Sequence, residues 1–312
     1  MPARKRALIL GALGVGVLAG WVRAAGAEVR IDVLISQDAE PYQQALEGFR
    51  RAFDQAGVKA AIEVFPLHGS ADAAGSALQH ARQSEAGLIL TLGSLATQAA
   101  VRQVTDTPIV AGLILNADDL GKAPNATGVV LEFPVETEFQ WLQRVLPGQK
   151  TIGVLFNPIE NQGRIDAAAK AARSVGLTLQ AHKVDSPREL PDALDSLTHR
   201  ADVLWGVADR VVLNPQTVKP ILLFSIRNRI PFIGLSQTWV KAGALYALDR
   251  DYADIGMQCA ELAGKILQGE PPRALPPVPP RKVTYSVNLR TARLLKLEIE
   301  PGLLRGAQSV IN

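Results

Sequence analysis

Residues 108–134 read PIVAGLILNADDLGKAPNATGVVLEFP, two apolar segments separated by a polar turn. The first segment, Ile109 to Leu115, is apolar and rich in β-branched residues, which predicts a buried strand. The polar cluster from Asn116 to Asn125 contains glycine and proline and predicts a turn. A second apolar run, 128–133, is ended by a proline. Strand and helix patterns alternate on both sides of this stretch, so we expect it to cross between two α/β bodies.

The flanking sequence repeats one architecture. In the first half, apolar runs predict strands at 29–35, 61–65, 87–92 and 109–115, with helical spacing of apolar residues between them. The second half repeats the alternation, with strands predicted at 151–156, 177–184, 201–207, 231–235, 243–248 and 282–287. Strands that alternate with helices at this spacing predict parallel, doubly wound sheets. The fold class is therefore predicted to be α/β, with two lobes.

The first residues have the layout of a secretory signal peptide. A basic cluster at Arg4–Arg6 precedes an apolar run from Ala7 to Val22, and Ala25-Gly26-Ala27 is a small-residue cleavage pattern. The apolar run is short for a membrane span. We expect cleavage after Ala27 and a periplasmic protein; the alternative is a leader retained as an inner-membrane anchor.

The charge balance argues against a nucleic-acid partner. Four of the 33 basic residues and none of the 30 acidic residues precede Glu28, so the remaining chain carries 29 basic and 30 acidic residues. A nucleic-acid-binding surface needs a clustered excess of Lys and Arg. The single cysteine, Cys259, follows Ile255 and precedes Leu262 at helical spacing, which predicts a buried thiol that packs as a small apolar side chain.

Polar residues follow the predicted strands, where ligands bind to open parallel α/β sheets. The Gly93-Ser94 pair also opens a helix, and free N–H groups at a helix start favour an anion such as a carboxylate. The alternative for each residue is an ordinary helix cap. The predicted ligand-binding residues are Ser36, Gln37, Tyr42, Gly93, Ser94, Asn116, Asn157, Asp185, Asp209, Ser236 and Gln237.

Asp209 is the sharpest of these predictions, because it ends the apolar run 201–208. A carboxylate at that position could hold a ligand ammonium, and Asp209→Asn would then weaken binding at least ~30-fold with little change in melting temperature. The alternative is that Asp209 caps the following turn or pairs with Arg210 or Arg227. In that case its loss would cost ~0.5–2 kcal/mol of folding stability instead.

Motifs of catalysis and cofactor binding are absent from the sequence. No Gly-x-Gly-x-x-Gly follows a strand, and there is neither a Walker loop nor a Gly-x-Ser-x-Gly. The four histidines lack metal-ligand spacing, and Asp249, Asp251 and Asp254 lack the Gly and the distal Glu of a calcium loop. We therefore predict no catalytic residue, no metal site and no cofactor.

The order of short motifs resembles the ABC-transporter substrate-binding protein family of bacterial periplasms. The resemblance spans nearly all of the chain after the leader. It rests on Pro41-Tyr42, Gly93-Ser94-Leu95-Ala96, Pro108-Ile109-Val110, Asn125-Ala126-Thr127-Gly128, Leu146-Pro147, Pro231-Phe232-Ile233-Gly234, Gly243-Ala244-Leu245 and Val287-Asn288-Leu289. It implies a type I periplasmic-binding fold, with two Rossmann-like lobes joined by a three-segment hinge that closes on a ligand. The chain departs from the family at Ser94, where a Thr is common, and at Asn116-Ala117, where an Asp-Pro is common.

The resemblance also sets the expected organisation and function. Lobe 1 is expected to comprise 28–125 and 249–281, and lobe 2 to comprise 126–248 and 282–312, after a signal peptide at 1–27. The expected function is the substrate-binding component of an ABC importer, which binds a small polar organic ligand, such as an amino acid, and delivers it to an inner-membrane permease and its ATPase. The alternative is a periplasmic ligand-sensing subunit for a membrane signalling receptor. An enzyme is not expected.

Overall fold

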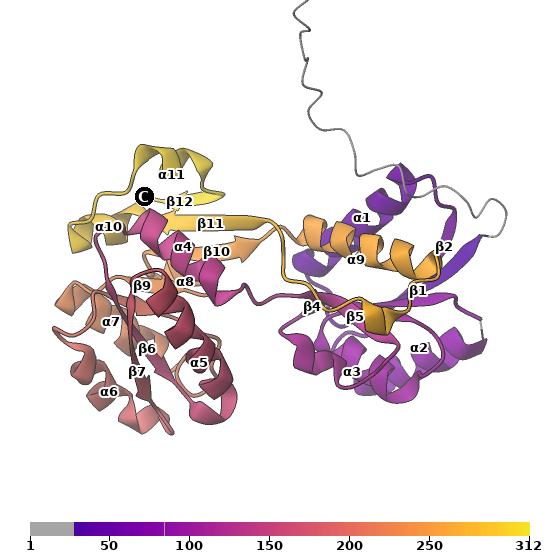
Figure 1. Ribbon diagram of the computed structural model, residues 1–312, viewed down its shortest axis with the longest axis horizontal. Helices are drawn as coiled ribbons and strands as arrows, with labels where there is room; N and C mark the ends of the chain where they lie inside the picture. Colours follow the sequence, from indigo (N-terminus) through magenta and orange to yellow (C-terminus); the bar gives the residue numbers. More distant parts are fainter. Residues whose placement is uncertain (1–27, 84) are drawn as a thin grey trace, which may run out of the picture. The chain divides into compact units, whose positions relative to one another are not determined.

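The computed structural model describes residues 28–83 and 85–312, and the predicted leader lies outside them. The described chain divides into two compact units (Figure 1). Unit 1 comprises residues 28–112, 119–128 and 256–276. Unit 2 comprises residues 113–118, 129–255 and 277–312.

Unit 1 is built on a five-stranded sheet with the order β2-β1-β3-β4-β5. The pairs β1–β2, β1–β3 and β3–β4 are parallel. Every residue of β3 and β4 is buried, as expected for apolar strands covered on both faces. The strands are β1 (Val29–Ile35), β2 (Ala60–Pro66), β3 (Leu88–Leu92), β4 (Ile109–Ile114) and β5 (Ala126–Val130).

Helices cover both faces of this sheet, with α1 and α9 on one side and α2 and α3 on the other (Figure 1). One face of α1 is buried, including Phe49 and Phe53. The helices are α1 (Glu40–Gln55), α2 (Ala71–Gln83), α3 (Ser94–Gln103) and α9 (Tyr252–Leu267), with short 3-10 turns η1 (Ala117–Leu120) and η3 (Pro272–Ala274). The first residues of α9 belong to unit 2.

Unit 2 is built on a seven-stranded sheet with the order β12-β11-β10-β9-β8-β6-β7. All neighbours are parallel except β10 and β11, which pair antiparallel. The strands are β6 (Thr151–Phe156), β7 (Thr178–Lys183), β8 (Val203–Trp205), β9 (Phe232–Gly234), β10 (Tyr246–Arg250), β11 (Val283–Asn288) and β12 (Ser309–Ile311).

The two faces of this sheet carry separate apolar cores. Val203 and Trp205 of β8 pack in the core that includes α4 and α5, while Leu204, between them, packs in the core of α6 and α7. This division follows from the period of two along a strand. The helices are α4 (Val135–Val145), α5 (Pro158–Ser174), α6 (Leu190–Leu197), α7 (Val218–Asn228), α8 (Gln237–Ala242), α10 (Leu289–Leu295) and α11 (Pro301–Gly306), with a 3-10 turn η2 (Pro187–Glu189).

The structure corrects two parts of the sequence-based architecture. The second sheet is not wholly parallel, because β11 returns beside β10 as an antiparallel strand. The chain also continues past the last predicted strand, at 282–287, with α10, α11 and a further strand, β12. Both differences arise near the C-terminus. There β11 and β12 extend the sheet beyond β10, and β11 runs antiparallel to it.

The chain changes unit near, but not at, the predicted positions. The predicted boundaries were 125/126, 248/249 and 281/282, whereas the units meet at 128/129, 255/256 and 276/277. The predicted boundaries at 248/249 and 281/282 therefore do not separate the two units. They lie in unit 2, where β10 and β11 hydrogen-bond to each other within one sheet.

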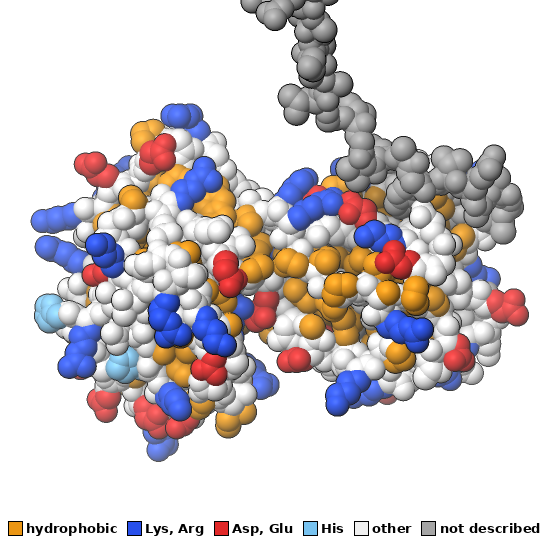
Figure 2. Space-filling view, viewed as in Figure 1, with side chains coloured by type: hydrophobic (Ala, Val, Ile, Leu, Met, Phe, Trp, Pro, Cys, Tyr) orange, Lys and Arg blue, Asp and Glu red, His pale blue; other side chains and the backbone are white. Residues whose placement is uncertain are grey.

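The surface charges, the single cysteine, membrane-spanning helices and metal-ligating clusters can also be compared with the sequence-based predictions. On the face shown in Figure 2, Lys, Arg, Asp and Glu side chains are interspersed over both units. Cys259 is fully buried, as predicted. Within the described residues, no helix has the length and apolar character needed to cross a membrane. No cluster of metal-ligating side chains is found in the same part of the chain.

Candidate functional site

Four predicted site residues lie together in unit 1. Gly93 has a φ of 93°, and a Cβ at this position would lie 2.7 Å from the Ser36 Oγ and 2.9 Å from a ring carbon of Tyr42. Ser36 accepts a hydrogen bond from the Ala96 N–H at 3.0 Å, within the first turn of α3. The Ser94 hydroxyl donates to the Asp119 carboxylate at 2.6 Å. Both serine hydroxyls are therefore already held by protein groups.

Gln37 and Asn116 follow β1 and β4, as the sequence indicated. Gln37 is exposed, and a Cβ on Gly69 would lie 3.4 Å from its side-chain nitrogen. Asn116 accepts a hydrogen bond from the Asp118 N–H at 3.0 Å, which is a local turn contact. Asn116 groups with unit 2, whereas Gln37 groups with unit 1.

Asn157 and Asp209 meet at the carboxyl ends of β6 and β8 in unit 2. One Asp209 oxygen accepts from the Asn157 N–H at 2.6 Å and from the Asn161 side chain at 2.9 Å. The other accepts from the main-chain N–H groups of Val211 and Val212, each at 2.9 Å. Asp209 is 5% exposed, and these four donors support its interpretation as a cap rather than a free carboxylate.

The remaining predicted residues lie near other strand ends. Asp185 is exposed after β7, and its main-chain N–H donates to Glu189 at 3.0 Å. Ser236 and Gln237 begin α8 after β9, and Ser236 makes no capping hydrogen bond with its side chain.

Unit 2 contains a partly polar cavity of about 220 Å³ whose lining residues all belong to that unit. It lies over the carboxyl ends of β8 and β9 and along β10, with residues of α4 and α5 on its other side. Its apolar wall includes Phe133, Trp205, Ile233, Tyr246 and Leu248. Asp209 and Ser236 do not line it, although their neighbours Ala208 and Leu235 do.

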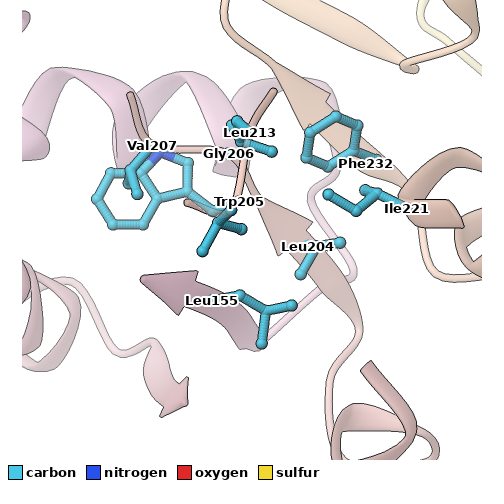
Figure 3. A pocket seen from close by; sticks show the side chains of 9 residues that line it. Leu155, Leu204, Trp205, Gly206, Val207, Leu213, Ile221 and Phe232 are labelled. Atoms are coloured by element: carbon cyan, nitrogen blue, oxygen red, sulfur yellow. The ribbon is translucent and has the colours of Figure 1, made fainter. Parts of the chain in front are cut away.

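A much smaller cavity, of about 10 Å³, lies beside it and is wholly apolar in its side chains (Figure 3). Leu155, Leu204 and Phe232 point into it from the sheet, and Ile221 points into it from α7. A space this small holds no organic ligand. The larger cavity is therefore the candidate site.

An ion cluster forms the helix side of the larger cavity. Arg164 on α5 contacts Glu138 on α4 at 2.7 Å and Glu132 at 3.6 Å. Its guanidinium also lies 5.6 Å from the centre of the Trp205 ring, within range of a cation–π interaction. These side chains are 17–30% exposed, so the cluster is only partly accessible to solvent. The Arg164 guanidinium therefore already interacts with Glu138, Glu132 and Trp205 of the protein.

Glu138 is the group in this cluster with a perturbed pKa. Burial raises the pKa of its carboxyl from 4.5 to about 7, against the opposing effect of Arg164 and Arg250. The nearby Glu132 carboxylate adds to the rise. Both charge states of Glu138 are accordingly accessible near neutral pH.

Arg250 is held differently. Its Nε donates to the Leu131 carbonyl at 2.7 Å, and its guanidinium lies 4.7 Å from the centre of the Phe133 ring. Among the described residues no carboxylate comes within ion-pair distance of this guanidinium. The stem of Arg250 is therefore fixed, while its two terminal nitrogens are available to an anion in the cavity.

Tyr246 on β10 also lines the cavity. The residue is 1% exposed, and its hydroxyl has no hydrogen-bond partner among the described residues. Burial, with a further contribution from Glu138, raises the pKa of this hydroxyl well above 10, so it stays a neutral donor.

Sequence reasoning missed Glu138, Arg164, Tyr246 and Arg250. One signal was present: Tyr246, Leu248 and Arg250 alternate along a strand and so share a face. No local pattern pairs Glu138 with Arg164, which lie 26 residues apart on separate helices.

The chain is similar to known proteins at low identity. A curated "Tyrosine-binding protein" of Clostridioides difficile (strain R20291) is 23% identical over 222 residues, which cover 68% of this chain and 63% of that protein. The ligand-free, open structure of a substrate-binding protein with adhesive properties from Clostridium difficile matches with a TM-score of 0.76 and 21% identity. That alignment covers 91% of this chain and 99% of the other.

A third similar structure is an ABC domain in complex with L-Trp from Streptococcus pneumonia, with a TM-score of 0.61 and 20% identity over 91% of this chain and 100% of that one. These likenesses show the fold, which is that of type I periplasmic binding proteins. The family model described as "ABC transporter substrate binding protein" matches residues 28–311. This chain therefore belongs to the ABC transporter substrate-binding protein family.

Proposed function

We propose that this protein is the periplasmic substrate-binding component of an ABC importer and that it binds an amino acid through the larger cavity of unit 2. The proposal rests on the two terminal guanidinium nitrogens of Arg250, which have no partner among the described residues and lie beside an aromatic wall. A guanidinium fork matches a carboxylate, and the wall matches an apolar side chain. The protein is a receptor rather than an enzyme in this proposal.

The relatives support the ligand class. One is named as tyrosine-binding and another was solved with L-Trp, both of which are aromatic amino acids. Delivery to an inner-membrane permease and its ATPase is the role that the family name implies for the bound form.

A titration of the purified protein tests the proposal. Calorimetry against the common amino acids should find at least one that binds, and Arg250→Ala should weaken that ligand at least ~30-fold, since loss of one partner of a buried charged pair costs ~2–5 kcal/mol. Arg250→Lys keeps the charge but not the fork, and should weaken binding by less. Arg210→Ala is the control, because its side chain is 89% exposed and pairs with Glu160. An unchanged affinity in Arg250→Ala would refute the assigned site.

The unit 1 residues form a separate part of the proposal. Tyr42 and Ser94, predicted from the sequence as ligand contacts, are tested with the same ligand by Tyr42→Phe and Ser94→Ala. A contact role predicts weaker binding in either variant with an unchanged melting temperature.

A further inference from the structure

The larger cavity of unit 2 is lined by equal numbers of acidic and basic side chains. Its charged lining residues are Glu132, Glu138, Arg164 and Arg250. When both glutamates are ionised, the charges of this lining sum to zero. A ligand with one net charge disturbs that balance, whereas a ligand with one charge of each sign preserves it. In a partly buried cavity an uncompensated charge is unfavourable, so the charge of the ligand matters for binding.

The two arginines of the cavity differ in their partners. Arg164 bridges both carboxylates, with Glu138 at 2.7 Å from one terminal nitrogen and Glu132 at 3.6 Å from the other. The terminal nitrogens of Arg250 have no partner among the described residues. A ligand carboxylate is therefore expected at Arg250, and its charge leaves the cavity with one negative charge in excess.

Glu132 is placed to compensate a ligand ammonium. Arg250 is held by the residues on either side of it, through the Leu131 carbonyl at 2.7 Å and the Phe133 ring at 4.7 Å. The Glu132 carboxylate lies in ion-pair range of Arg164, and no residue of the described chain donates a hydrogen bond to it. An ammonium on the carbon next to a carboxylate bound at Arg250 can donate to Glu132.

A proton on Glu138 is the other way to compensate the excess charge. Burial raises the pKa of this carboxyl to about 7; Arg164 on α5 and Arg250 on β10 oppose the rise, and Glu132, from the segment before α4, adds to it. The remaining titratable neighbour, Tyr246 on β10, stays neutral. Because the two glutamates share Arg164, the proton belongs to the pair and not to one residue alone.

We propose, building on the proposed function, that this cavity couples ligand binding to proton binding. An amino acid binds while Glu132 and Glu138 are both ionised, whereas a carboxylic acid without an ammonium binds together with one proton on this pair. Arg250 holds the ligand carboxylate in both cases, and Glu132 contacts the ammonium of the amino acid. The selectivity of the site for amino acids over carboxylic acids is therefore set by pH.

The direction of the pH dependence follows from linkage between ligand and proton. Above a pH of about 7 the pair is ionised, so an amino acid binds without proton exchange and a carboxylic acid must take up a proton. Below that pH the free protein already holds the proton, so the carboxylic acid binds without exchange and the amino acid must displace it. The affinity for the amino acid thus rises with pH, and the affinity for the carboxylic acid falls.

Calorimetry at about pH 6 and about pH 8 tests this inference with two pairs of probes. They are L-phenylalanine with 3-phenylpropanoate and L-leucine with 4-methylpentanoate, in which each acid is the amino acid without its ammonium group. The charge of each probe is the same at both pH values. The ratio of the Kd of the acid to the Kd of the amino acid should be at least ~10-fold larger at the higher pH. An unchanged ratio, or no binding of either pair, would overturn the inference.

Proton exchange is measured directly by repeating the titrations in HEPES and in Tris, whose ionisation enthalpies differ. At about pH 8 the acid of the binding pair should take up about one proton per molecule bound, and its amino acid should take up none. Binding of the acid without proton uptake at this pH would contradict the coupling. So would an acid that fails to bind even at the lower pH.

Two variants locate the proton and the ammonium. Glu138→Gln imitates the protonated carboxyl and should remove the pH dependence of the ratio. Glu132→Gln should weaken the amino acid at least ~10-fold and leave the acid unchanged or tighter, because a charge-assisted hydrogen bond is lost only with the ammonium. A wild-type pH dependence in Glu138→Gln would overturn the inference.

Glu160→Gln is the matched control. The Glu160 side chain is 22% exposed, close to the 20% of Glu138, and it also pairs with an arginine, Arg210, at 3.0 Å. It does not line the cavity. Glu160→Gln should therefore keep the wild-type ratio at both pH values, and a change as large as that in Glu138→Gln would count against the assigned pair.

The outcomes separate this inference from the proposed function. If an amino acid binds, with loss in Arg250→Ala, but no ratio changes with pH, the inference fails and the proposed function stands. If no amino acid binds at all, both fail.

Discussion

Asp209 and Asn157 are joined by a 2.6 Å hydrogen bond from the Asn157 main-chain N–H to the Asp209 carboxylate, which links the end of β6 to the turn after β8. Three further donors use the remaining capacity of that carboxylate. These two residues therefore organise the edge of the sheet, whereas the cavity beside it is lined by other residues.

Asp209→Asn should destabilise the protein. Each carboxylate oxygen of Asp209 accepts two hydrogen bonds, so the NH₂ group of an asparagine would face two donors that then lack an acceptor. Because the residue is only 5% exposed, water cannot replace the lost acceptor. Buried donors left without an acceptor cost ~1–3 kcal/mol each, so we expect a loss of ~2–5 kcal/mol in urea denaturation. Asp202→Asn is the comparison, because exposed Asp202 also accepts two main-chain N–H groups and should cost less. Unchanged stability with lost ligand affinity would instead restore the sequence-based hypothesis of a ligand contact.

Glu138 should make stability depend on pH. Its folded pKa of about 7 exceeds its ordinary value of 4.5, so between these values the folded protein holds a proton that the unfolded chain releases. The stability contribution of Glu138 therefore falls as the pH rises from 4.5 to 7 and is flat above that, with a maximum change of about 3 kcal/mol. Denaturation curves of wild type and Glu138→Gln should show this difference, and parallel pH profiles would contradict it.

Gly256→Ala should destabilise unit 1. A Cβ on Gly256 would overlap the Ala45 carbonyl and lie 2.8 Å from the Phe49 main-chain nitrogen, both on α1. Backbone atoms cannot turn aside, so we expect a net loss of ~1–3 kcal/mol despite the better helix propensity of alanine. Gly163→Ala on α5 is the control, because its Cβ would meet no atom within 4 Å, and it should be neutral or stabilising by up to ~1 kcal/mol. Equal melting temperatures for the two variants would refute the close approach of α9 and α1.

Cys259 should be unreactive in the folded protein. It is fully buried, its Sγ lies 3.6 Å from the Ala111 carbonyl, and burial raises the pKa of its thiol to about 12. The thiolate that reacts with disulfide reagents is therefore scarce at pH 8. A colorimetric thiol assay should detect no labelling before denaturation and one equivalent after it; rapid labelling of the native protein would contradict this.

The sequence by itself determined the alternation of strands and helices in both units. Strand and helix periods are local, so the runs at 87–92 and 201–207 indicated β3 and β8, and the spacing around Cys259 indicated the buried face of α9. The motif order indicated the family for the same reason, since it is read along the chain.

Only the tertiary structure decided the candidate site and the end of the second sheet. The antiparallel return of β11 depends on pairing with β10, which a local pattern does not encode. Arg164 and Glu138 carry charges that would be expected at the surface from their type, and they form one wall of a cavity because α4 and α5 pack side by side on the sheet. Within the described part of the chain, the terminal nitrogens of Arg250 have no protein partner, and this depends on contacts between residues that are distant in the sequence.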